Sequence, residues 1–134
     1  MKQSPSDYRG MTDFPYEAFV QHAVEQWLTR EGFQIFPDPL VDVKASKDSG
    51  VGRKVWHIEA KGKTSAVGLD FRTGVGQLVQ RMKDRAHQYG IAIPDIPEFR
   101  KQTDKFAPWV LSKLQIHWIW VSKDGSVSVD PPPQ

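Results

Sequence analysis

The chain has 134 residues, a length that suits one domain with one core. Its 39% hydrophobic and 25% charged residues are ordinary for a globular protein, and a formal net charge of +2 permits a nucleic-acid partner without demanding one. Disulfides and thiolate-ligated zinc are excluded because there is no cysteine, and no segment approaches the roughly 20 apolar residues of a membrane span.

The ends of the chain are more polar than its middle. The N-terminus has no apolar signal core, so we expect an intracellular, cytoplasmic protein without membrane contact. We expect a flexible N-terminal segment at residues 1–12, a single domain at 13–130 and a proline-rich tail at 131–134. The tail contains three consecutive prolines, which cannot continue a sheet.

The first half of the domain predicts one helix and three strands. From Tyr16 to Arg30, apolar residues recur with the i, i+3, i+4, i+7 spacing of an amphipathic helix, and Gly32 marks its end. Strands are expected at 33–36, 40–45 and 55–61, with a turn at 47–52.

The second half alternates helices and strands. A helix is expected from Thr73 to Gln88, and Gly90 ends it. Gln77, Arg81 and Arg85 lie in one row on this helix. The polar segment 62–74 suits a mobile loop. A strand at 91–93 follows, then a helix over 98–114 that Pro108 breaks or kinks, then strands at 116–121 and 127–129 joined by a hairpin turn. This order predicts an α/β fold with a mixed sheet and helices on its faces.

The tripeptide Glu59-Ala60-Lys61 ends the third predicted strand. Side chains alternate along a strand, so Glu59 and Lys61 share one face, with His57 beside them. Asp42, on the second predicted strand, supplies another carboxylate. Two carboxylates and the backbone carbonyl of Ala60 would suit Mg²⁺, and Lys61 could orient a water or stabilise phosphate oxygens. The alternative interpretation is an exposed Glu59–Lys61 ion pair without function.

These residues, in this order of elements, resemble the PD-(D/E)xK nuclease superfamily, which includes type II restriction enzymes and archaeal Holliday-junction resolvases. Asp42 matches the family acid, Glu59-Ala60-Lys61 the acid-x-lysine motif, and Gln77 a glutamine on the following helix. The resemblance covers roughly residues 14–121 and implies a restriction-endonuclease-like αβββαβ core, with a central mixed sheet flanked by helices on both faces. The literal Pro-Asp pair is Pro37-Asp38, so Asp38 is the reserve for Asp42.

The resemblance implies a Mg²⁺-dependent endonuclease or exonuclease, with Mn²⁺ as a substitute, that cleaves DNA by in-line attack of metal-activated water. Asp42, Glu59, the Ala60 carbonyl and Glu17 on the first helix would hold the metal, Lys61 would handle the attacking water, and Gln77 would position water or phosphate. Glu17 could equally be a solvated residue at the edge of its helix. Some superfamily members keep the fold without cleavage, so an inactive module that binds nucleic acid or a protein is the alternative.

Basic residues surround the candidate site in the sequence. Those expected to contact nucleic acid are Lys44, Arg53, Lys54, Lys63, Arg72 and Arg81. Basic residues in exposed loops also occur without function. The resemblance favours DNA over RNA as the partner, and a homodimer or a larger complex with a recognition subunit is a further hypothesis. His57 could approach the metal, but we favour a histidine that packs beneath a helix and bonds a neighbour.

Overall fold

A six-stranded mixed sheet forms the centre of the computed structural model, which describes residues 12–134. The strands lie in chain order, with β2 antiparallel to β1 and β3, β4 parallel to β3 and β5, and β6 antiparallel to β5. Their bounds are β1 (Gln34–Phe36), β2 (Val43–Ser49), β3 (Gly52–Ala60), β4 (Gln88–Pro94), β5 (Ile116–Val121) and β6 (Val127–Asp130).

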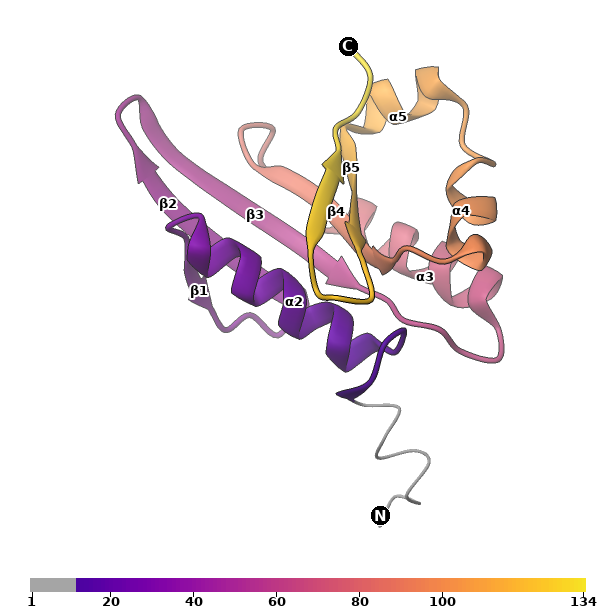
Figure 1. Cartoon of the computed structure of the whole chain (residues 1–134). Coiled ribbons are helices and arrows are strands. Elements are labelled where there is room, and N and C mark those ends of the chain that lie inside the picture. The colour runs from indigo at the N-terminus through magenta and orange to yellow at the C-terminus, as the bar shows by residue number, and fades with distance from the viewer. Residues whose placement is uncertain (1–11) are drawn as a thin grey trace.

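Helices cover both faces of this sheet (Figure 1). α2 (Glu17–Arg30) packs on one face, and α3 (Val67–Gln80), α4 (Pro97–Thr103) and α5 (Pro108–Leu114) lie on the other. The expected α/β fold, with an αβββαβ core and a mixed sheet flanked by helices, is confirmed.

Two hydrophobic cores follow from the alternation of side chains along the strands. In β4, Ala92 joins the core beneath α2, whereas Ile91 and Ile93 join the core beneath α3 and α4. In β3, Trp56 and Ile58 face α2. The alternate residues of β3 therefore face α3, and this places His57 and Glu59 on the α3 side of the sheet.

The end of α2 agrees with the expectation from Gly32. Gly32 has φ +88°, its N–H donates to the Thr29 carbonyl at 3.0 Å, and the Phe33 N–H donates to the Leu28 carbonyl at 2.9 Å. These two bonds form a Schellman motif, in which glycine accommodates the left-handed backbone. The chain then continues into β1, the edge strand that follows α2.

Several predicted boundaries were wrong. β2 begins at Val43, so Asp42 precedes the strand instead of lying within it. α3 starts six residues earlier than expected and ends at Gln80, so Arg85 lies outside the helix and Gly90 lies within β4. The segment expected as a loop at 62–74 therefore contains the first half of α3. The tertiary cause is β4, whose pairing with β3 begins at Gln88 and withdraws those residues from the helix.

The break expected near Pro108 separates two short helices. α4 and α5 each begin with proline, Pro97 and Pro108, where the missing N–H has no helical acceptor to lose. No described helix is long and apolar enough to span a membrane. The expected flexible segment, residues 1–12, lies outside the described residues except for Thr12.

Candidate active site

The register between β2 and β3 brings the two candidate acids together. Val43 pairs with Ile58, so the next residues outward, Asp42 and Glu59, lie opposite each other. Opposed residues of an antiparallel pair project from the same face, with Cβ atoms about 5 Å apart. Desolvation by burial raises the pKa of Glu59, and the negative charge of Asp42 acts directly on Glu59 and raises it further. The acids thus lie on one side of the sheet.

Two hydrogen bonds fix Asp42 at the start of β2. Its Oδ2 accepts the backbone N–H of Ala60 at 2.8 Å, and its carbonyl accepts a bond from Gln21 Nε2 at 3.3 Å. Gln21 belongs to α2, so Asp42 is tied both to the end of β3 and to the first helix. The Ala60 amide therefore holds the carboxylate of Asp42 beside Glu59.

Glu59 is an acid in a buried position. It is only 5% exposed, although glutamate is rarely buried without a charged partner. Desolvation, followed by the negative charge of Asp42 and the hydrogen bond to it, raises the pKa of Glu59 to about 7, and Lys61 and Arg81 oppose this shift. In the absence of a bound cation, the Asp42–Glu59 pair thus tends to retain a proton near neutral pH.

The side chain of Lys61 packs against Gly74 of α3. A Cβ placed on Gly74 would approach Lys61 Cε to 2.8 Å and Cγ to 3.3 Å, so any larger residue there would displace the lysine stem. Gln77 and Arg81 follow Gly74 at i+3 and i+7, on the same side of the helix axis. Glycine at position 74 thus allows the amine of Lys61 to lie between β3 and α3.

Glu17 reaches the site because a second glycine lets two backbones cross. A Cβ on Gly62 would overlap the backbone nitrogen of Glu17 and the carbonyl carbon of Tyr16. The Lys63 N–H, one residue later, donates to the Pro15 carbonyl at 2.9 Å. Desolvation, and then the charge of Asp42, raises the pKa of Glu17, whereas Lys61 lowers it. The sequence did not indicate that Gly62 is needed for this crossing.

One cavity of about 520 Å³ receives the predicted catalytic residues. It is lined by Glu17, Asp42, Glu59, Lys61, Gln77 and Arg81, together with the segment Asp38–Val41. The side chains come from α2, α3, the end of β3 and the connection between β1 and β2. The structure therefore gathers all five predicted catalytic side chains around one space.

The carboxylate of Asp38, the reserve for Asp42, accepts a hydrogen bond within its own turn. Its Oδ1 accepts the Leu40 N–H at 2.7 Å, and its Oδ2 lies 3.6 Å from Lys44 Nζ. The backbone bond from Leu40 holds the pKa of Asp38 below its usual range; burial opposes this shift, and the charge of Lys44 adds to it. The contacts with Ala60 and Glu59 belong to Asp42 instead.

The predicted basic residues are dispersed. Arg81 lines the main cavity, and its Nε donates to the Leu40 carbonyl at 2.9 Å, whereas Lys44 lines a neighbouring cavity. Arg53 and Lys54 lie near the β2–β3 turn, roughly 16–20 Å along β3 from Glu59 at about 3.3 Å per residue. Lys63 pairs with Glu98 at 3.1 Å, and Arg72 is exposed on α3. The predicted basic residues therefore do not form one positively charged patch.

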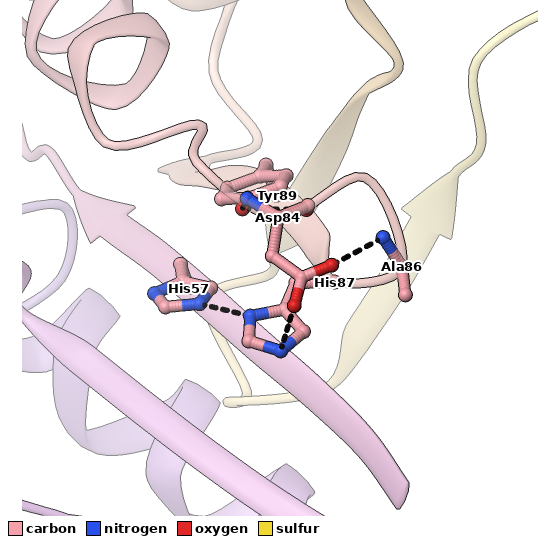
Figure 2. Close-up of polar contacts among 5 residues, drawn as sticks. All are labelled: His57, Asp84, Ala86, His87 and Tyr89. Atoms are coloured by element: carbon pink, nitrogen blue, oxygen red, sulfur yellow. Dashed lines mark hydrogen bonds and ion pairs between the residues drawn. The ribbon is translucent and has the colours of Figure 1, made fainter. Parts of the chain in front are cut away.

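His57 bonds a neighbour, as the favoured interpretation predicted. His57 Nε2 lies 2.9 Å from His87 Nδ1, and His87 Nε2 lies 3.3 Å from Asp84 Oδ2 (Figure 2). Tyr89 of β4 pairs with His57 of β3, and its hydroxyl donates a hydrogen bond to the Asp84 carbonyl at 2.9 Å. Partial burial, and then His87, lowers the pKa of His57. Nothing in the sequence indicated this series of hydrogen-bonded side chains, because its members come from separate elements.

The carboxylates of the site are compatible with a cation whose coordination shell is completed by substrate and water. No group of three or more acids or histidines in the described part of the chain is arranged to hold a metal ion by itself. Mg²⁺ in phosphate chemistry is commonly held by one or two carboxylates, with substrate oxygens and water completing its shell. Asp42 and Glu59, two adjacent carboxyls of which one is buried, fit that smaller requirement.

Comparison with solved structures shows a likeness in fold. The fold is similar to that of an XisH family protein from Nostoc punctiforme PCC 73102, with a TM-score of 0.53 and 14% sequence identity, over 85% of this chain and 98% of that one. At this identity the likeness shows a shared fold alone. No protein-family model matches the sequence, and no curated protein matches it.

Proposed function

We propose that this protein is a metal-dependent nuclease of the PD-(D/E)xK superfamily that hydrolyses phosphodiester bonds, with DNA as its substrate. The observation that carries the proposal is the proximity of Asp42, just before β2, to Glu59 of β3, in the same cavity as Lys61 and Gln77. The αβββαβ order of elements, which the superfamily resemblance implied, supports the same conclusion.

A divalent cation, when bound, would supply a water of lowered pKa and would offset the charge that develops on the phosphate. Asp42 and Glu59 would hold it, with the Ala60 carbonyl and Glu17 as further oxygen donors. The like charges of the two acids favour this, because a cation relieves the repulsion that otherwise retains a proton on the pair. Mg²⁺ is the expected ion and Mn²⁺ its substitute.

The remaining roles belong to side chains of this chain. The amine of Lys61, between β3 and α3, would hydrogen-bond the attacking water or a non-bridging phosphate oxygen. Gln77 can donate through its amide nitrogen to phosphate and accept through its oxygen from water. Arg81, a fixed positive charge on the same cavity wall, would orient the substrate phosphate. Attack would be in line, with the ester oxygen leaving opposite the water.

The test is a cleavage assay on labelled DNA and RNA with Mg²⁺, Mn²⁺ or a chelator. Lys61→Met retains the aliphatic stem beside Gly74 but removes the amine, and Glu59→Gln retains the shape of the buried side chain but removes its charge. Each variant is expected to lose at least about 100-fold in rate, as for other groups that stabilise transition-state charge. Lys105→Ala, at an exposed position between α4 and α5, is the matched control.

The outcomes separate the nuclease from the binding module. Metal-dependent cleavage by the natural chain and the Lys105 variant, but not by the other two, would support the proposal. Cleavage that persists in the Lys61 and Glu59 variants would refute the assigned site. Binding of nucleic acid without cleavage of any substrate form would favour the inactive module instead.

A further inference from the structure

A second cavity of about 400 Å³ adjoins the candidate active site. The two cavities share Asp38, Leu40, Val41 and Arg81 as a common wall. Since the Arg81 Nε bond to the Leu40 carbonyl fixes that wall, a group bound on one side lies next to whatever occupies the other. The volume is within the range of small-molecule sites.

The floor of this second cavity contains three rings. The His57 and His87 rings are nearly parallel, with an interplanar angle of 22° and centroids 5.0 Å apart, and are joined by their 2.9 Å hydrogen bond (Figure 2). The Tyr89 ring lies nearly parallel to His57, at 14° and 5.0 Å between centroids. Tyr89 stacks on one face of His57, and both imidazoles line the cavity and remain partly exposed. The histidine pair, His57 and His87, therefore offers a flat surface.

The orientation of this pair is fixed from one end. The Asp84 carboxylate is an acceptor, so His87 presents Nε2–H to it and accepts at Nδ1 from His57 Nε2–H. Asp84 is itself held by the Ala86 N–H at 2.8 Å and by Tyr89. Rings held in this way lose little conformational entropy when a planar ligand stacks on them.

The charges around the cavity favour an anion. Lys44, Arg81 and Lys83 line it, and Asp38 and Asp84 are the acids in its wall. Asp38 lies near Lys44, and Asp84 bonds His87, whereas Arg81 has no ion pair among the described residues. A positive excess beside a flat aromatic surface is the combination used to bind single-stranded nucleic acid, in which bases stack and cations contact phosphates.

We propose that this second cavity binds an unpaired nucleotide adjacent to the scissile phosphate, with its base on the histidine pair and its phosphate near Arg81 and Lys44. The inference rests on the proposed nuclease function and specifies its substrate as single-stranded or locally unpaired nucleic acid. A paired base is unavailable, because both of its faces are already stacked within the duplex.

The test measures binding by the full chain in a chelator, so that it does not depend on cleavage. The probes are a labelled oligothymidylate of about twelve nucleotides, an abasic oligomer with the same number of phosphates, and a duplex of equal length. Base stacking predicts that the oligothymidylate binds about tenfold tighter than the abasic oligomer. It should also bind tighter than the duplex, whereas a purely electrostatic surface prefers the higher charge density of the duplex.

Variants assign the effect to the histidine pair. His87→Ala should remove most of the difference between oligothymidylate and abasic oligomer, His87→Phe should retain it by preserving a ring, and His22→Ala, on an exposed site of α2, is the control. Thermal unfolding checks that each variant folds. Equal affinity of the natural chain for the two oligomers would overturn the inference, whatever the variants do, and so would an undiminished difference in a folded His87→Ala. Cleavage assays then test the nuclease proposal separately.

Discussion

The substitution Gly74→Ala separates the position of Lys61 from the stability of the fold. Gly74 is buried within α3, and alanine there would lie 2.8 Å from Lys61 Cε. Carbon atoms pack at about 3.5–4.0 Å, so the lysine stem must move by roughly 1 Å. A displacement of that size at a catalytic group can reduce the rate by about 100-fold.

Alanine also changes the helix itself. Replacing glycine in a helix interior stabilises the protein by about 1 kcal/mol, which corresponds to a few degrees in Tm for a chain of this size. Displacement of Lys61 subtracts from this gain at Gly74. Gly76→Ala is the matched control, because it is in the same helix and an added Cβ meets nothing within 4 Å.

We expect Gly76→Ala to raise Tm by a few degrees without loss of cleavage. Gly74→Ala should show a smaller gain in Tm and a rate lower by one to two orders of magnitude. The measurements are thermal unfolding by circular dichroism and single-turnover cleavage with Mg²⁺. Equal cleavage rates for the two alanine variants would refute the argument that the position of Lys61 governs catalysis.

Three further predictions follow from the site. Because the folded pKa of Glu59 is raised to about 7, the folded state binds more protons than the unfolded state between about pH 4.5 and 7. The Tm without metal should therefore fall as pH rises through this window, and Mg²⁺ should restore more of it at pH 8 than at pH 5. Glu59→Gln should reduce both effects, and the raised pKa of Glu17 accounts for the remainder. Asp42→Asn should reduce the cleavage rate at least about 100-fold. Asp38→Asn keeps the oxygen that accepts the Leu40 N–H and should change the cleavage rate only a few-fold. The reverse result would make Asp38 the catalytic acid. Gly62→Ala should lower both Tm and cleavage, because its Cβ meets the backbone of Glu17 and no side-chain rotation can relieve the overlap; an unchanged Tm would contradict this.

The elements that the sequence predicted well are those whose signals are local. α2 has an amphipathic period and a glycine that ends it, and β5 is a continuous apolar run with the predicted bounds. α3 lies six to eight residues earlier than predicted because its first turn contains Gly68, a residue of low helix propensity, and because Gln88 to Gly90 join a strand through pairing with β3. That pairing depends on residues far apart in the chain, which a local pattern does not contain.

The site shows the same division. Glu59 and Lys61 were predictable because alternation along one strand sets their common face. The closeness of Asp42 depends on the register of β2 against β3, and that of Glu17 on the crossing at Gly62. Neither follows from spacing in the sequence. The Asp84–His87–His57 chain was missed for a similar reason, because it needs β4 to lie beside β3.

The Asp42–Glu59 pair is electrostatically unfavourable when both acids are ionised and no cation is bound. A buried carboxyl beside a second carboxyl raises the free energy of the ionised state, and an apolar residue at position 59 would avoid this cost. A structural role would require only the Ala60 amide bond to Asp42, which does not involve the Glu59 side chain. Local rules of folding are violated mainly at functional sites. The proposed cation, by binding both acids, would offset the electrostatic cost at Glu59.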